Sequence, residues 1–147
     1  MLSRFLFLCS VMTLAACGDP LFVFPGGALT GESAAPPPDW SAVADEDVIQ
    51  VEFRPSDPYS HNIWAVGLGA DLYIATSAEG TRWTPFIDAD PRVRVRVKGA
   101  IHDLVASAVG GEGDERGRVA AAYTEKYDID EEDNWVTDAL IYRLDRP

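Results

Sequence analysis

Hydrophobic and polar residues alternate with a period of two over several stretches after residue 47, and this pattern predicts β-strands. Ile49, Val51 and Phe53 alternate with polar residues, which is typical of a strand with one buried face. In segment 92–98 valine alternates with arginine and lysine, so the valines are expected to face a core and the basic residues solvent. The pattern predicts six strands, at residues 48–53, 62–66, 72–76, 92–98, 101–109 and 139–144.

Two helices are predicted among these strands. Residues 83–89 form a short helix that ends at Asp90, because the residue before a proline is disfavoured in the α region. Residues 115–127 form an amphipathic helix with Asp114 as its cap. Strands and helices do not alternate regularly, which favours a small antiparallel barrel with the helices on its outside. The expected core positions include Ile49, Val51, Phe53, Val93, Val95, Val97 and Leu140.

The first residues have the features of an export signal. Arg4 precedes the apolar run 5–14, which is too short to cross about 30 Å of hydrocarbon. Ala15 and Ala16 stand directly before Cys17, and this ending resembles the lipobox of bacterial lipoproteins. The resemblance implies a signal peptide at residues 1–16 and a lipid on Cys17. Gly18 follows the cysteine, which by similarity to sorted lipoproteins favours the outer membrane, on its periplasmic or surface side.

Residues 17–46 are predicted to be a tether between the lipid and a domain at residues 47–147. The segment is rich in proline and glycine, including the run Pro36-Pro37-Pro38, which favours extended chain. Its apolar residues 21–24 and Trp40 are costly to expose, so parts of it are expected to lie against the domain.

Charge and cysteine content exclude several classes of function. The chain has 24 acidic and 12 basic residues and a net charge of −12, which excludes nucleic-acid binding. Cys9 is removed with the signal and Cys17 takes the lipid, so a disulfide, thiol redox chemistry and a cysteine zinc site are excluded in the mature chain. His61 and His102 are too few for a histidine-rich metal site, and no metal site is predicted.

Segment 72–76, Trp83 and the run Asp90-Pro91-Arg92-Val93-Arg94-Val95-Arg96-Val97-Lys98-Gly99 together resemble the split β-barrel proteins related to pyridoxamine 5′-phosphate oxidase. The similarity is greatest to the flavin- and deazaflavin-dependent oxidoreductase branch and covers roughly residues 46–146. It implies a mainly β (α+β) domain, a six-stranded antiparallel split β-barrel with two outer helices.

The resemblance also implies a place for FMN or a deazaflavin against the barrel strands. The residues that could hold it by position are Arg54, Tyr59, Ser60, Asn62 and Trp83, together with Arg92, Arg94 and Arg96. The loop 78–81 lacks the basic cluster that favours phosphate binding, which departs from this expectation.

Other polar groups leave alternatives open. The arginines of segment 92–98 suit phosphate or carboxylate recognition, but they equally suit internal pairing with the many carboxylates. The acidic stretch 128–134 is read as a solvated loop, because it lacks the spacing of a calcium loop.

Two classes of function remain. The first is a lipid-anchored envelope protein whose barrel is a binding or interaction module, and this is favoured because no acid, base or nucleophile is assembled recognisably. The alternative is an FMN- or deazaflavin-dependent oxidoreductase that acts on a small acceptor in the periplasm. The expected partners are the membrane, through the lipid on Cys17, and a small-molecule ligand, and a homodimer is a further candidate assembly.

Overall fold

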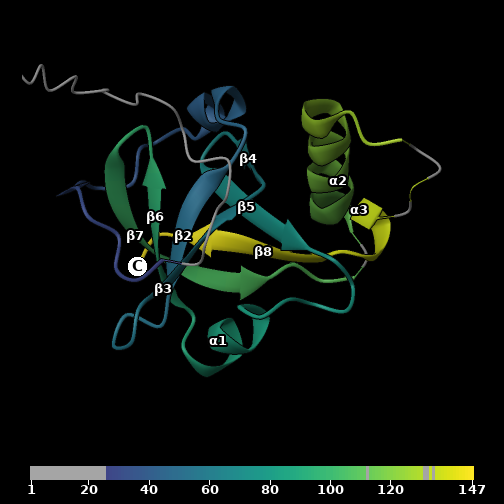
Figure 1. The fold of residues 1–147 in the computed structure, drawn as a ribbon. Helices are drawn as coiled ribbons and strands as arrows, with labels where there is room; N and C mark the ends of the chain where they lie inside the picture. Colours follow the sequence, from purple (N-terminus) through teal and green to yellow (C-terminus); the bar gives the residue numbers. More distant parts are fainter. Residues whose placement is uncertain (1–25, 112, 131–132, 134) are drawn as a thin grey trace, which may run out of the picture.

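The computed structural model describes residues 26–147 except 112, 131–132 and 134 (Figure 1). The predicted signal peptide, Cys17 and the first part of the predicted tether lie outside the described residues. No helix within the described part of the chain is long and apolar enough to cross a membrane.

The described residues form one curled sheet of eight strands, in the order β3-β2-β6-β7-β8-β5-β4, with the short β1 paired to β7. All pairings are antiparallel except that of β1 with β7, which is parallel. The strands are β1 (Glu32–Ser33), β2 (Ile49–Phe53), β3 (Tyr59–Ile63), β4 (Ala65–Leu68), β5 (Asp71–Thr76), β6 (Arg92–Val97), β7 (Ala100–Ala108) and β8 (Leu140–Asp145). The helices are α1 (Thr84–Ala89), α2 (Asp114–Tyr127), α3 (Trp135–Asp138) and the 3₁₀ helix η1 (Ser41–Asp45).

β7 joins the two halves of the sheet. Its first part pairs with β6 and its last part with β8, and Val105 belongs to both pairings, opposite Arg92 and Asp145. The sheet therefore curls around the main core. This core contains the alternating apolar residues of β2 and β6, with Leu72 and Ile74 of β5.

A second core lies on the outer face of the sheet, under α2. Tyr73 and Ala75 of β5 point to this side, opposite to Leu72 and Ile74, and pack with Val119 and Tyr123 of α2. Figure 1 shows α2 and α3 beside one end of the sheet and α1 at another place on its rim. The amphipathic helix expected at residues 115–127 is thus confirmed, but its N-cap is Gly113 and not Asp114, which is the first residue of the helix.

The split-barrel fold with a mainly β content is confirmed, but the strand count is not, because the described residues contain eight strands and not six. β3 begins three residues before the strand expected at residues 62–66. It pairs with β2 along its whole length because a tight turn precedes it, in which Arg54 has φ 53° and the Asp57 amide donates to the Arg54 carbonyl oxygen over 2.8 Å. Trp64 then separates β3 from β4, so the strand expected at residues 62–66 is two strands.

The predicted core positions are confirmed with one difference. Those in β2 and β6 are buried, whereas Leu140 is only partly buried and packs at the edge of the core.

Residues 26–46, here called the strap, run along the sheet, and Trp40 and Val43 near their end belong to the main core. Gly26 exchanges two backbone hydrogen bonds with Ser60 of β3, of 2.9 and 2.8 Å. Farther on, the strap forms β1 against β7, and the Ala34 amide donates to the Ile101 carbonyl oxygen over 2.8 Å. The part of the predicted tether that the structure describes is therefore bound to the domain.

Trp40 anchors the end of the strap. Its side chain is 1% exposed and meets the ring of His102 edge-on, and its amide donates to the Gly69 carbonyl oxygen over 2.7 Å. A Cβ at Gly67 would lie 2.1 Å from the Trp40 carbonyl oxygen, so only glycine allows this approach. The expected docking of Trp40 is confirmed.

Candidate functional site

The sheet separates the predicted cofactor-binding residues into two groups. In β3, Tyr59 pairs with Phe53 and therefore shares the side of the barrel core, whereas Ser60 pairs with Glu52 on the opposite side. Asn62 lies on the same side as Ser60. The structure brings Arg54, Tyr59 and Trp83 into one region and places Ser60 and Asn62 behind the sheet.

Trp83 is part of the barrel core. Its side chain is 3% exposed, its ring stacks on Phe53 with centroids 5.0 Å apart and 6° between planes, and Tyr142 meets it edge-on. A ligand ring cannot stack on Trp83 without displacing these aromatic partners.

Ser60 is covered by the strap. Its backbone is paired to Gly26, and a Cβ at Gly26 would lie 2.7 Å from the Ser60 hydroxyl oxygen. The side chain of Ser60 thus faces the strap and not an open pocket.

Arg54 and Tyr59 belong to a row of four side chains, here called the arginine–aromatic cluster, with Phe86 of α1 and Arg82 just before it. The Arg54 guanidinium lies 4.1 Å above the centroid of the Phe86 ring. Tyr59 meets Phe86 edge-on at 5.4 Å, and the Arg82 guanidinium lies 5.7 Å from the centroid of Tyr59. Two cations therefore flank one aromatic pair, an arrangement that cation–π attraction stabilises.

Two nitrogens near this cluster are buried and have no hydrogen-bond partner within the structure. They are Nε of Arg54 and Nδ1 of His61, whose ring stacks on Tyr59 with centroids 6.4 Å apart. The other end of the Arg54 guanidinium pairs with Asp57 over 3.2 Å. Buried polar atoms normally have partners, so the Arg54 Nε–H fits an acceptor such as a phosphate or carboxylate oxygen, as does the form of His61 that carries a proton on Nδ1.

The arginines of β6 are engaged by the protein itself. Arg92 pairs with Asp90 over 2.6 Å, and hydrogen bonds from Arg92 lower the pKa of Asp90 to about 2. Arg96 donates to the Thr30 carbonyl oxygen of the strap over 3.1 Å.

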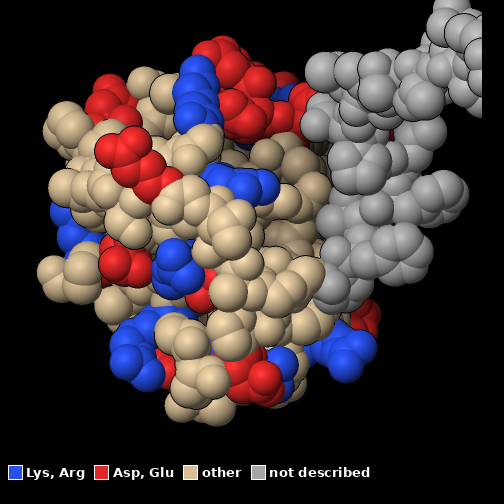
Figure 2. Space-filling model, turned by 60° about the vertical axis from the view of Figure 1, so that its left-hand side comes forward, with Lys and Arg blue, Asp and Glu red and all other residues tan. Residues whose placement is uncertain are grey.

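Arg94 pairs with Glu52 over 3.1 Å and faces Asp103 at 3.7 Å. A pocket of about 310 Å³ lies beside Arg92 and Arg94, but both guanidiniums already have carboxylate partners. Figure 2 shows basic and acidic side chains side by side over one face of the molecule. These contacts agree with internal pairing, one of the two interpretations that the sequence leaves open.

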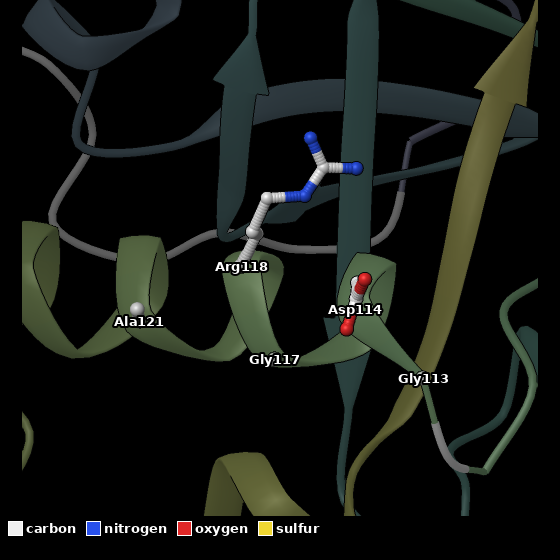
Figure 3. A pocket seen from close by; sticks show the side chains of 5 residues that line it. All are labelled: Gly113, Asp114, Gly117, Arg118 and Ala121. Atoms are coloured by element: carbon white, nitrogen blue, oxygen red, sulfur yellow. The ribbon is translucent and has the colours of Figure 1, made fainter.

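A shallow hollow of about 790 Å³ runs along the exposed side of α2 (Figure 3). Its lining is Gly113, Asp114, Gly117, Arg118 and Ala121, so three of the five residues offer no polar side-chain atom. Among the described residues no group of three or more histidine, cysteine, aspartate or glutamate side chains is arranged to hold a metal ion.

Comparisons with known proteins reveal the fold. No protein-family model matches the sequence, and the comparison with curated proteins found no match. Solved structures do match. The heme storage protein HutZ from Vibrio cholerae has a TM-score of 0.56 and 17% identity, over 71% of this chain and 84% of that one.

An F420-H2 dependent reductase has a TM-score of 0.55 and 17% identity, over 68% and 95%. A protein from Listeria innocua assigned to the pyridoxamine 5′-phosphate oxidases has a TM-score of 0.53 and 14% identity, over 70% and 86%. The chain folds as a split β-barrel. Identities this low carry the fold and not the activity.

Sequence reasoning missed Arg82 and Phe86 as members of the cluster. Arg82 directly precedes Trp83 and Phe86 follows it by three residues, and this single cation close to two aromatic residues is a weak signal. Their meeting with Arg54 depends on β3, which sequence alternation does not predict.

Proposed function

We propose that this protein is a lipid-anchored envelope protein whose split barrel binds an anionic small molecule at the arginine–aromatic cluster. The observation that carries the proposal is the pair of buried, unpartnered nitrogens, Arg54 Nε and His61 Nδ1, beside two guanidiniums.

Electrostatics supports an anion at this place. The chain carries a net charge of −12, so its field repels anions unless cations gather locally. Arg82 is such a cation, and so is Arg54, which pairs with Asp57 at one end of its guanidinium and keeps Nε unpartnered. The planar fork of arginine binds oxygens of a phosphate or carboxylate. The rings of Tyr59 and Phe86 between them offer an apolar contact to the rest of the ligand.

The lipid anchor is supported by the order of basic residue, apolar run, small pair and Cys17. Mass spectrometry of the mature N-terminus tests it. We expect a chain that begins at Cys17 and carries acyl groups, and an unprocessed chain in Cys17→Ser. A mature wild-type chain that starts elsewhere and has no lipid would contradict the anchor.

An oxidoreductase that uses FMN or a deazaflavin is a second candidate. Similar folds occur in an F420-H2 dependent reductase and in a heme storage protein, and the cluster fits the anionic end of such a cofactor. Arg54 and Arg82 would hold its phosphate, and Tyr59 is the ring best placed beside its aromatic part. When bound, such a cofactor supplies hydride transfer. Trp83 does not fit the role of stacking platform, because its ring is packed in the core.

One titration separates the two candidates. The full chain, purified in a nonionic detergent, is titrated by calorimetry with pyrophosphate, FMN, heme and the phosphate-free riboflavin. We expect FMN or pyrophosphate to bind, and Arg54→Ala or Arg82→Ala to weaken that binding about tenfold or more, since a hydrogen bond to a charged group contributes about 1.5–3 kcal/mol. Arg118→Ala on α2 is the matched control and should bind as the wild type does.

The outcomes differ for the two candidates. Pyrophosphate binding without tighter binding of FMN supports an anion-binding module, whereas FMN binding much tighter than pyrophosphate and riboflavin supports the cofactor enzyme. Binding that is unchanged in Arg54→Ala and Arg82→Ala, or no binding of any probe, would overturn the proposed site.

A further inference from the structure

A third pocket lies at the C-terminal end of α2, opposite to Gly113. It has a volume of about 360 Å³ and combines four aromatic or apolar side chains with three carboxylates. Its lining residues are Trp64, Tyr127, Asp128, Ile129, Asp130, Asp133 and Trp135. We call it the aromatic–acidic pocket.

Trp64 is the feature that needs an explanation. With 42% of its surface exposed, it is the one large hydrophobic residue counted as exposed in the part of the chain that the structure describes. Its ring stacks on Tyr127 with centroids 4.4 Å apart and 9° between planes, and it meets Trp135 edge-on at 5.7 Å. The exposed surface of Trp64 is therefore part of an ordered aromatic wall.

The protein holds this wall in place. The Tyr127 hydroxyl accepts from the Ala65 amide over 2.9 Å and lies 3.1 Å from the Asp47 carbonyl oxygen. The Tyr123 hydroxyl lies 3.0 Å from the carbonyl oxygen of Trp64. A ligand that stacks on Trp64 would thus meet rings already fixed in position, which reduces the entropic cost of binding.

The three carboxylates lie at or just after the C-terminus of α2, where the helix makes a negative charge unfavourable. Asp128 is the C-terminal cap of α2, and Asp130 and Asp133 follow it closely. The C-terminus of a helix carries a partial negative charge, which repels carboxylates and attracts cations. No ion pair among the described residues uses any of these three side chains.

The neighbouring cation is engaged elsewhere. The Lys126 ammonium donates to the carbonyl oxygens of Val43 and Ala65, each over 2.8 Å, and it lies 4.9 Å from the Tyr127 ring centroid. One Asp133 oxygen accepts from the Trp135 amide over 3.3 Å. The remaining carboxylate oxygens are available to a positive ligand.

We infer that the aromatic–acidic pocket binds an organic ammonium cation, with Trp64 stacking on the cationic group and Asp128, Asp130 and Asp133 neutralising it. Tryptophan is the side chain best suited to cation–π contact, and carboxylates beside aromatic rings favour alkylated ammonium groups over anions and neutral molecules. The inference is independent of the proposed function, because the pocket shares no residue with the arginine–aromatic cluster.

The test compares a cation with its neutral analogue of the same shape. The full chain in a nonionic detergent is titrated with choline and with 3,3-dimethyl-1-butanol, which replaces the quaternary nitrogen by carbon, and binding is followed by calorimetry and tryptophan fluorescence. We expect choline to bind at least about tenfold more tightly than the neutral alcohol, and its affinity to fall with rising salt.

Variants locate the binding. Trp64→Leu keeps an apolar side chain and removes the indole, and we expect choline affinity to fall about tenfold. Asp128→Asn, a change that the left-handed backbone at this residue tolerates, should weaken choline severalfold. Asp114→Asn, an exposed carboxylate at the other end of α2, is the matched control and should have no effect. Circular dichroism verifies that each variant is folded.

Two results would overturn the inference. Equal affinity for choline and the neutral alcohol would show an apolar groove without a preference for charge. Choline binding that is absent, or unaffected by both Trp64→Leu and Asp128→Asn, would remove the site.

Discussion

The guanidinium of Arg94 lies 3.1 Å from the carboxylate of Glu52, whose side chain is 1% exposed. The same carboxylate accepts a hydrogen bond from the backbone amide of Leu29 in the strap. A buried acid is thus satisfied jointly by a neighbouring strand and by the strap that covers it. The basic side of β6 is therefore, at this position, an interior surface between strap and sheet.

This relationship predicts that Arg94→Gln destabilises the domain. The change leaves the buried Glu52 carboxylate without its cation, and we expect a loss of about 2–4 kcal/mol in the free energy of unfolding. Urea unfolding of the full chain in detergent, followed by circular dichroism, measures it. Arg96→Gln is the control. The hydrogen bond from Arg96 to the Thr30 carbonyl oxygen is exposed, so water can replace it, and the effect should stay below about 1 kcal/mol. If the two substitutions lower the free energy of unfolding equally, the buried pair stabilises the domain no more than the exposed hydrogen bond does.

The alternation in residues 92–98 correctly predicts which side chains of β6 face the barrel core, but not what covers the other side. It treats the arginines as solvated, and on that basis Arg94→Gln would be nearly silent. The strap that buries Glu52 comes from a segment rich in proline and glycine, far away in the sequence, and has almost no period of its own. Local pattern predicts the faces of a strand, whereas the partners of each face are set by contacts between distant segments.

The close approach of Gly67 and Trp40 predicts that Gly67→Ala releases the strap. The new methyl group would lie 2.1 Å from the Trp40 carbonyl oxygen, so either β4 or the strap must move. We expect the emission of Trp40 to shift to longer wavelength and the strap to be cleaved faster in limited proteolysis.

Gly110→Ala is a suitable control, because nothing lies within 4 Å of a Cβ at that position. If Gly67→Ala and Gly110→Ala are cleaved at the same rate as the wild type, the strap is not held through Trp40.

The candidate site could be predicted only in part, because strand pairing and contacts between distant segments decide which side chains meet. Arg54 and Tyr59, two of the residues that the sequence offers as cofactor-binding by position, are both in the arginine–aromatic cluster. Ser60 and Asn62 are not, because β3 begins at Tyr59, before the strand predicted at residues 62–66, and a strand sends successive side chains to opposite faces, so that both lie on the side away from Tyr59. Trp83 is excluded by a stacking contact with Phe53 that the sequence does not reveal. Whether any of the five binds a cofactor stays a prediction.

Tyr73 predicts a specific loss of stability at high pH. Its hydroxyl donates to the Glu115 carboxylate over 3.0 Å, and Arg143 donates to the same oxygen over 2.7 Å. Burial first, and then the hydrogen bond to Glu115, raise the pKa of Tyr73 to about 12 from the usual 10.0 of a tyrosine. Below pH 10 the phenol is protonated in both the folded and the unfolded chain, so its contribution to stability is complete. As the pH rises from 10 towards 12, the unfolded chain releases the proton and the folded chain does not, so the free energy of unfolding falls.

The comparison of wild type with Tyr73→Phe isolates this effect, because other buried tyrosines such as Tyr123 also have a raised pKa and are common to both chains. We expect the difference in free energy of unfolding between the two proteins, measured by urea unfolding, to be constant below pH 10. Above pH 10 the wild type should lose stability relative to Tyr73→Phe. In Glu115→Gln the pKa of Tyr73 should move back towards its ordinary value, since the substitution removes both a charged acceptor and a nearby negative charge. A stability difference that does not change between pH 9 and pH 12 would mean that the Tyr73 phenol ionises alike in the folded and unfolded chains.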